Sequence, residues 1–375
     1  MRRKPFPLKP PKKILLIATR RIGDVLLITP VIRSIRFAYP GAKIDVVVFK
    51  GTEGCISANK DIDHIIGIQE SATLREQVKT ICSLFRKYDL AISTLSGDRP
   101  VFYSWIAGKS CMGFVEKGYK NLWKRLLLDR YELFDNYETH TVTMNLSLLN
   151  QLDIKPMPEI TASWTKEDEI AFRQLLPFDM EKKSYAVINV CPMFSYKMWN
   201  LEGWRKLIGW LNKSKGLEIV LTGGNSSDEL GYISLLRQSL PNDSINIAGK
   251  VSLSGVAYLL SKASVYVGLD TSVTHMAAAL GIPTIALYGP TNPVKWGPMP
   301  NNVSFSGKSP YKIKGSQIVK NVFLLQGQGD CVPCHEEGCD RNVRSFSKCL
   351  QEISADAVIE AAETMMMRSR SPNIV

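Results

Sequence analysis

The stretch GLDTSVTHMAAALGIP, residues 268–283, holds the side chains whose types and spacing most clearly suggest chemistry. Asp270 and Thr271 lie between an apolar run and an alanine-rich stretch, and His275 follows one turn later. Free N–H groups at the start of a helix, together with the positive end of the helix dipole, favour a phosphate. The pattern therefore predicts a site for a phosphorylated ligand, with Asp270 holding a ribose, an amine or an ammonium group. The alternative is that Asp270 or Thr271 is only an N-cap.

Two further loops in the second half of the chain suit the same kind of ligand. Lys197, in CPMFSYKMW, is placed to reach a pyrophosphate. Thr222, Gly223 and Gly224 end an apolar run and would let the backbone approach a ligand closely. The alternatives are a lysine that faces water and a turn that only ends a strand. Neither a Walker A sequence nor GxGxxG is present, so ATPase and NAD-dehydrogenase functions lack their motifs.

The informative stretch of the first half is TRRIGDV, residues 19–25. A carboxylate at Asp24 is suited to act as general base towards the hydroxyl of an acceptor. Arg20 and Arg21 are suited to bind an anionic acceptor. The alternative is that Asp24 caps a helix and both arginines are solvated.

A cysteine-rich stretch near the end of the chain is the one candidate for a metal. It begins with C-x2-C, which resembles half of a zinc site, but the later spacings match no familiar zinc module. The competing interpretation is a compact loop of reduced or redox-labile thiols. The weak metal candidates are Cys331, Cys334, Cys339 and Cys349.

An alternation of apolar runs and helical stretches must position these residues. It predicts parallel sheets, and therefore two Rossmann-like halves in tandem with ligands at the carboxyl ends of the strands. Pro30 marks a kink or a restart within a helix over residues 25–37. The expected strands are 13–19, 43–49, 64–68, 90–94, 185–190, 217–221, 245–248, 265–267 and 284–287.

Composition narrows the class of protein. The 375 residues suggest about two domains, and the net charge of +12 implies an anionic partner. Nucleic acid ranks lowest among such partners, because no zinc-finger or RNA-binding signature accompanies the charge. No apolar stretch is long enough to cross a bilayer, and the basic start of the chain lacks a secretory core. We therefore expect a cytoplasmic protein with reduced thiols.

The expected domains are a basic disordered arm over residues 1–12, a first Rossmann-like domain over 13–160 and a second over 161–350. Residues 351–375 form a terminal helix and tail. Residues 98–145 are rich in aromatic and basic side chains. That mixture is typical of an ordinary half-buried surface, and it also suits docking to a lipid headgroup or a sugar.

Three stretches together resemble one family. They are ATRRIGDVLLITPVIRSIRFAYPGAKIDVVV, then YKMWNLEGWRKLIGWL followed by EIVLTGG, and GLDTSVTHMAAALGIPTIALYGPTNPVKWGP. In this order they are similar to the lipopolysaccharide heptosyltransferases, the ADP-heptose:LPS group of glycosyltransferase family 9. The resemblance extends over about residues 13–350, and the third stretch is its most specific part.

The resemblance implies a GT-B fold: α/β, with two Rossmann-like domains of parallel sheet facing each other across a cleft. It also implies that the terminal helix packs back on the first domain. By position, Asp24 would be the catalytic base and Lys197 would neutralise the donor pyrophosphate. The resemblance places Asp270, Thr271, Ser272 and His275 around the nucleotide diphosphate. Such enzymes generally need no metal, so Lys197 and the helix dipole must offset the leaving-group charge.

The function implied is an inverting, metal-independent glycosyltransferase without a cofactor. It would move a sugar, heptose from ADP-heptose, onto an anionic lipid-linked saccharide such as the lipopolysaccharide core. We expect it to contact the inner face of the cytoplasmic membrane as a peripheral protein. The alternatives are a non-catalytic relative that binds nucleotide sugars as a regulatory or scaffold subunit, and a GT-B epimerase. Asp24 together with Lys197 favours the enzyme, because a binder needs no base.

Overall fold

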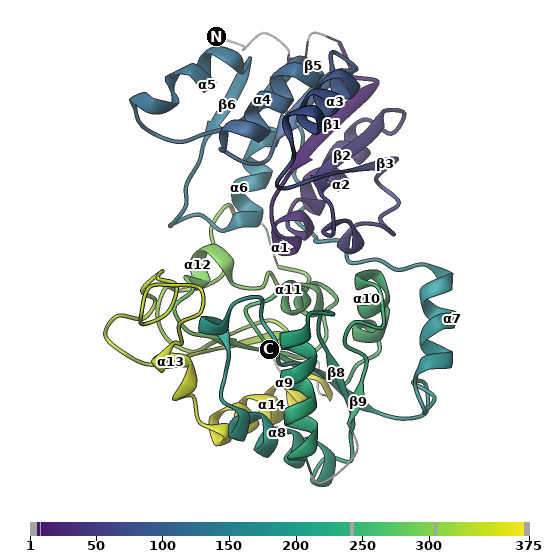
Figure 1. Ribbon diagram of the computed structural model, residues 1–375, viewed down its shortest axis with the longest axis vertical. Helices are drawn as coiled ribbons and strands as arrows, with labels where there is room; N and C mark the ends of the chain where they lie inside the picture. The colour runs from purple at the N-terminus through teal and green to yellow at the C-terminus, as the bar shows by residue number, and fades with distance from the viewer. Residues whose placement is uncertain (1–5, 8, 241–243, 304–305, 371–375) are drawn as a thin grey trace. The chain divides into compact units, whose positions relative to one another are not determined.

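The computed structural model describes residues 6–7, 9–240, 244–303 and 306–370. Its contacts divide the chain between Thr161 and Ala162 into two compact units (Figure 1). Unit 1 comprises residues 1–161 with 305–308, and unit 2 comprises 162–304 with 309–375. Of the predicted basic arm over residues 1–12, residues 1–5 and 8 lie outside the described residues.

Unit 1 is built on one six-stranded sheet in which every ladder is parallel. Its order is β3-β2-β1-β4-β5-β6, the order of a Rossmann sheet. Residues 14–17 of β1 are fully buried, as expected of a central strand covered on both faces. The strands are β1 (Lys13–Ala18), β2 (Lys43–Phe49), β3 (His64–Ile68), β4 (Tyr88–Ser93), β5 (Gly108–Val115) and β6 (Arg130–Leu133).

The helices of unit 1 cover this sheet. They are α1 (Ile22–Leu26), α2 (Thr29–Ala38), α3 (Leu74–Leu84), α4 (Asp98–Ala107), α5 (Leu122–Leu127) and α6 (Thr141–Ser147), with short 3-10 turns η1 (Glu53–Cys55), η2 (Tyr119–Asn121) and η3 (Leu148–Gln151). Helix α2 packs with α6, whereas α3 packs with α4 (Figure 1). Pro30 lies in the first turn of α2, so the predicted restart is confirmed.

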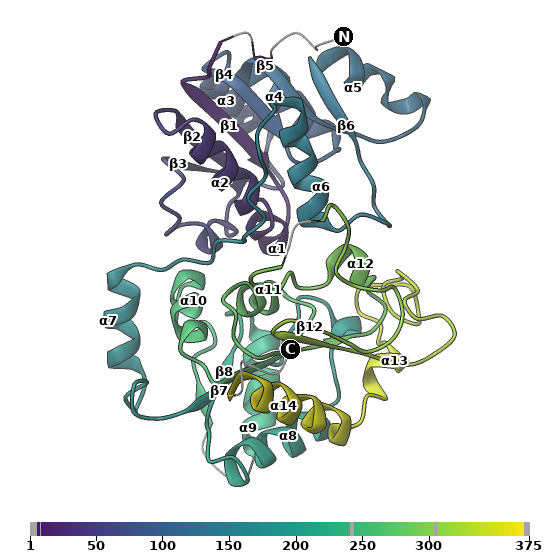
Figure 2. The same cartoon turned by 180° about the vertical axis from the view of Figure 1, so that it is seen from behind.

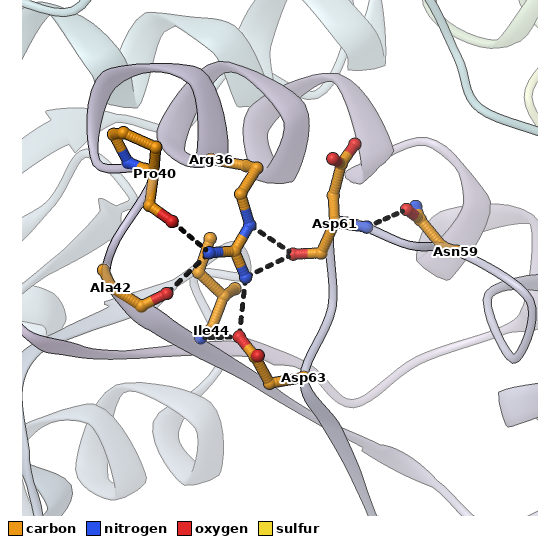
Figure 3. Close-up of polar contacts among 7 residues, drawn as sticks. All are labelled: Arg36, Pro40, Ala42, Ile44, Asn59, Asp61 and Asp63. Atoms are coloured by element: carbon orange, nitrogen blue, oxygen red, sulfur yellow. Dashed lines mark hydrogen bonds and ion pairs between the residues drawn. The ribbon is translucent and has the colours of Figure 1, made fainter.

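An arginine fastens the end of α2 to the start of β2 (Figure 3). The Arg36 guanidinium donates to the carbonyl oxygens of Ala42 at 2.6 Å and Asp61 at 3.1 Å, and pairs with Asp63 Oδ2 at 2.6 Å. The same Asp63 oxygen accepts from the backbone N–H of Ile44 at 2.7 Å. Since one side chain satisfies several loop carbonyls, it fixes the connection that carries the chain from α2 into β2.

Unit 2 repeats the same strand order. Its sheet runs β12-β13-β11-β10-β7-β8-β9, and only the β12–β13 ladder is antiparallel. Leaving out the edge strand β12, the strands follow the Rossmann order with β7 first and β10 fourth. They are β7 (Tyr185–Asn189), β8 (Glu218–Thr222), β9 (Ile245–Asn246), β10 (Val265–Leu269), β11 (Thr284–Tyr288), β12 (Gln317–Val319) and β13 (Val322–Gln326).

The helices of unit 2 form two groups. Helix α7 packs with α10 and α10 with α11, whereas α8 packs with α9 and α14. Together with the 3-10 turn η4 (Ser195–Lys197), the helices are α7 (Lys166–Leu175), α8 (Leu201–Lys213), α9 (Ser227–Gln238), α10 (Leu253–Ser261), α11 (Ser272–Ala279), α12 (Pro293–Trp296), α13 (Lys348–Gln351) and α14 (Ala355–Arg370).

The terminal helix corrects one expectation. The resemblance implied that it packs back on the first domain, but α14 belongs to unit 2 (Figure 2), and its apolar face is buried in the core of that unit. Val358, Ala361 and Ala362 are fully buried there, against α8 and strands β10, β11 and β13. The small alanine side chains let the helix approach the sheet closely, and the buried apolar area stabilises this position.

Across the ranges that the structure describes, we find no helix both long and apolar enough to span a bilayer.

Candidate functional site

The predicted residues of unit 2 gather where β7 and β10 lie side by side. These strands pair in parallel, with Gly268 opposite Asn189, so their carboxyl ends meet at one edge of the sheet. From β7 the strand order continues through β8 and β9 towards one edge of the sheet, and from β10 it continues through β11 and β13 towards the other edge. The position between β7 and β10 is therefore the topological switch point. Ligands of open α/β sheets bind at such a point.

Asp270 follows β10 directly and is held by three side chains. Lys197, at the end of η4, brings Nζ to 2.5 Å from Oδ2 of Asp270. The hydroxyl of Thr291 donates to the same oxygen at 2.8 Å. The hydroxyl of Tyr288 donates to the carbonyl oxygen of Trp296 at 2.8 Å and also lies 3.3 Å from Oδ1 of Asp270. The structure therefore brings Lys197 and Asp270 together.

The charges of this pair are set by burial and by each other. Burial alone would raise the pKa of Asp270, but the ion pair and hydrogen bond with Lys197 outweigh it, so the pKa is lowered. Asp270 is therefore a carboxylate at neutral pH. Burial lowers the pKa of His275 to about 4, despite the opposing effect of Asp270. His275 is therefore a neutral imidazole that can accept or donate a hydrogen bond without adding charge.

The start of α11 has the features of an anion site. Thr271 is the N-cap residue by position, but within the described residues it makes no side-chain cap bond. Its hydroxyl instead lies 3.4 Å from Oδ1 of Asn189 and 3.3 Å from the Thr274 hydroxyl. Nδ1 of His275 is buried and has no hydrogen-bond partner among the described residues. Ser272 is the first helical residue, so Asp270 and Thr271 precede the helix directly and His275 lies one turn into it, as predicted.

Thr222, Gly223 and Gly224 end β8, next to β7, but their contacts explain them structurally. The Thr222 hydroxyl accepts from Nδ2 of Asn189 at 3.1 Å. A Cβ added at Gly224 would meet the carboxylate of Glu229, and one added at Gly223 would lie 3.0 Å from Ile233. Packing within the unit therefore accounts for both glycines, whereas ligand approach stays a prediction.

Three residues of this edge were missed by the sequence reasoning: Asn189, Tyr288 and Thr291. Asn189 ends β7 and links the loops after β8 and β10, while Tyr288 ends β11 and Thr291 lies in the following loop. Polar residues that end apolar runs were the available signal. Their partners depend on strand order, which the runs alone do not reveal.

The predicted residues of unit 1 meet at the carboxyl end of β1, the first strand of that sheet. Asp24 lies in the first turn of α1, and Nε of Arg20 lies 3.8 Å from its Oδ2. Burial raises the pKa of Asp24, while Arg20 and the backbone N–H of Arg21 oppose this without cancelling it. The hydrogen bond from Arg21, the N-cap residue, means that Asp24 also supports the helix start.

Three of the four candidate cysteines lie in irregular chain and Cys349 lies in α13; all four are free thiols. Burial, together with the nearby Cys334, Cys331 and Cys339, raises the pKa of Cys349 to about 11. A search of the described residues finds no group of three or more His, Cys, Asp or Glu arranged to hold a metal ion. Among the described residues the weak metal candidates are therefore not assembled as a site.

Comparisons with known proteins identify a family. The family model described as glycosyltransferase family 9 (heptosyltransferase) matches residues 79–320. Lipopolysaccharide heptosyltransferase 3 of Escherichia coli K12 is 29% identical over 361 residues, which cover 92% of this chain and 95% of that protein.

Solved structures agree in fold. A glycosyltransferase of family 9 from Veillonella parvula superposes with a TM-score of 0.74 at 20% identity, over 95% of this chain and 97% of that one. The E. coli heptosyltransferase WaaC with ADP gives 0.69 at 23% identity, over 94% and 99%.

These findings fix the class of protein. The α/β fold of GT-B type is confirmed by two Rossmann-ordered units and by the likeness to solved heptosyltransferases. The chain belongs to glycosyltransferase family 9, and it is a glycosyltransferase.

Proposed function

We propose that this enzyme transfers heptose from ADP-heptose to the lipopolysaccharide core. Family membership and the names of the relatives support heptosyl transfer, and one structural neighbour was solved with ADP. The single observation in this chain that carries the proposal is the ion pair between Lys197 and Asp270 beside the start of α11.

In the proposed reaction the donor diphosphate binds at the start of α11. The first-turn N–H groups and the helix dipole attract its charge, and His275 supplies a neutral hydrogen-bonding group. Lys197 neutralises the negative charge that develops on the leaving diphosphate. Asp270 holds Lys197 in place, and the hydroxyls of Thr291 and Tyr288 hold Asp270.

Asp24 is the general base of the proposed mechanism. Its carboxylate removes the proton from the acceptor hydroxyl while the hydroxyl oxygen attacks the anomeric carbon. The bond from that carbon to the diphosphate breaks, and the configuration inverts in this single displacement. A raised pKa makes the Asp24 carboxylate a stronger base than an ordinary aspartate. Arg20 and Arg21 bind the anionic groups of the acceptor.

The proposal includes three further properties: no cofactor, no metal and peripheral binding to anionic membrane at the cytoplasmic face. Lys197 and the helix dipole take the role that a divalent ion has in other transferases. The net charge of +12 and the basic residues 1–12 support attraction to anionic headgroups, each basic residue contributing about 1 kcal/mol near the surface.

A transfer assay tests the reaction directly. The purified protein is incubated with ADP-heptose and a heptose-containing core oligosaccharide, with and without EDTA, and NMR of the product reports the new anomeric configuration. We expect transfer with inversion and full activity in EDTA. Binding of ADP without transfer to any core acceptor would instead favour the non-catalytic relative. A requirement for Mg²⁺ or Zn²⁺ would contradict the metal-free mechanism.

Deletion of residues 1–12 tests the electrostatic part of membrane binding. The truncated protein should bind anionic vesicles more weakly than the full chain at low salt, because salt screens exposed charges within about 10 Å at 0.1 M. Equal binding of the two proteins would remove the arm from the proposal.

A further inference from the structure

Helix α5 and the turn before it expose an unusual row of large apolar side chains. Tyr119, Leu122, Trp123 and Leu126 are 78%, 52%, 39% and 86% exposed. Their spacing of three, four and seven residues places them on one side of a helical segment. Isolated exposed apolar residues are ordinary, but a contiguous row marks a contact surface. We call these four residues the α5 surface.

The opposite side of α5 is fixed to unit 1, so the row is not a sign of a loosely held helix. Nζ of Lys124 donates to the carbonyl oxygen of Ser96 at 2.7 Å and pairs with Asp98 at 2.7 Å. Leu128, directly after the helix, is buried in a cluster with Val101 and other residues of α4 and β5. The unit therefore presents the α5 surface outward on a rigid base.

The charges within the α5 surface are basic, and acidic residues lie only at its ends. Lys117 and Lys120 are exposed beside the apolar row, whereas the exposed Glu116 and Asp129 precede and follow it in the sequence. The Arg125 guanidinium stacks 5.6 Å from the ring centroid of Tyr131, which is itself partly exposed. Aromatic residues with a polar end, next to lysines on long apolar stems, are suited to the boundary between headgroups and acyl chains.

We infer that the α5 surface inserts into the interface of an anionic membrane, with Lys117 and Lys120 contacting lipid phosphates. This deepens the proposed membrane contact and names a surface that is independent of residues 1–12. The lysines beside the apolar row complement anionic headgroups, which favours a lipid surface, and a second copy of this chain would bring these lysines together.

Vesicle binding by the full-length protein tests this inference. Co-sedimentation with phosphatidylglycerol-containing vesicles is compared for the wild type and the variant Leu122→Glu/Leu126→Glu. Insertion of apolar side chains persists when salt screens the charges. We therefore expect the variant to lose about tenfold or more of the binding that remains at high salt.

A matched control separates the position of the change from its chemistry. Leu235, on α9 of unit 2, is 53% exposed, almost the same as Leu122. Leu122→Glu alone should weaken binding, whereas Leu235→Glu should not. A second comparison, between the wild type and Trp123→Phe, involves no change of charge. Brominated lipids should quench the fluorescence of the wild type more than that of this variant.

Three outcomes would overturn the inference. One is equal high-salt binding of the wild type and the double variant, and another is equal quenching of the wild type and Trp123→Phe. The third is a wild-type dimer that the double variant converts to a monomer, which would assign the surface to self-association. Transfer to a soluble core oligosaccharide should be unchanged in the variant, so failure of this inference is distinguishable from failure of the proposed reaction.

Discussion

Two aspartates at the switch-point edges of the two sheets have similar exposure and opposite electrostatics. Asp24, after β1, and Asp270, after β10, are 14% and 12% exposed. Burial raises the pKa of both, yet the pKa of Asp24 ends above its ordinary value and that of Asp270 below it. Burial alone therefore does not determine the chemistry of either residue.

The difference lies in the distance to a cation. Lys197 lies 2.5 Å from Asp270, whereas Arg20 lies 3.8 Å from Asp24. A close ion pair stabilises the charged carboxylate more than a distant one does. The closely paired aspartate is suited to hold a lysine at the donor diphosphate, and the loosely paired aspartate is suited to accept a proton.

The largest effect should come from removing the proposed base. Asp24→Asn should lower the transfer rate by about 10²–10⁴-fold, the usual contribution of a general base, with little change in ADP affinity. Single-turnover rates and calorimetric ADP binding measure the two effects. Asp270→Asn, at the switch-point edge of the sheet in unit 2, is the control. Unlike Asp24→Asn, this variant should weaken ADP binding. A fully active Asp24→Asn enzyme would remove Asp24 from the mechanism.

The buried imidazole should make stability depend on pH. The pKa of His275 is about 4 in the folded protein and near 6.5 when unfolded, so the unfolded state binds a proton first as the pH falls. The contribution of the neutral His275 imidazole to the free energy of unfolding is complete above pH 6.5. It decreases by about 3 kcal/mol as the pH falls to about 4. Thermal unfolding of the wild type and His275→Gln at a series of pH values measures it. Parallel pH dependence in the two proteins would contradict this assignment.

Removing Lys197 should reduce the difference in pKa between Asp24 and Asp270. Lys197→Met leaves Asp270 without its cation, so the pKa of Asp270 should rise and the protein should lose roughly 1–3 kcal/mol of stability. ADP affinity should also fall. The double variant Lys197→Met/Asp270→Asn should recover stability but not ADP affinity. Recovery of both would show that Lys197 acts only on the fold.

The smallest effect should come from Asn189. Its amide links the Thr222 and Thr271 hydroxyls, so Asn189→Ala should cost about 1 kcal/mol of stability and weaken ADP binding a few-fold. Urea unfolding and calorimetry check both values. A loss of transfer with unchanged ADP affinity would instead place Asn189 in the chemical step.

The strands of both sheets that are long and uninterrupted could be predicted from the sequence. The runs 43–49 and 64–68 are strands with the predicted bounds; the first is rich in β-branched residues, and the second keeps two adjacent isoleucines despite Gly67. Strands β5, β6, β12 and β13 were missed. GKSCMGFV and RYEL show no clear period, and QIV and VFLLQ are short. The core that the terminal helix covers is determined by residues far from it in the sequence. The apolar pattern of the helix itself does not reveal which core this is.

Of the candidate site, the loops could be predicted but not the partners. Asp270 and Lys197 were both proposed, each from its own loop, and only the pairing of β7 with β10 explains their contact. Tyr288 and Thr291 were missed because they come from the next strand, β11, and its loop. Gly224 was proposed for ligand approach, which stays a prediction; a Cβ at this position would meet the carboxylate of Glu229.

The most direct test of the contrast is a carboxyl titration. The protein labelled with ¹³C at aspartate carboxyls is titrated by NMR, and the signals are assigned from Asp24→Asn and Asp270→Asn. We predict a pKa above the ordinary value of 3.8 for Asp24 and below it for Asp270. Equal pKa values, or the reverse order, would contradict the assignment of one aspartate as base and the other as the partner of Lys197.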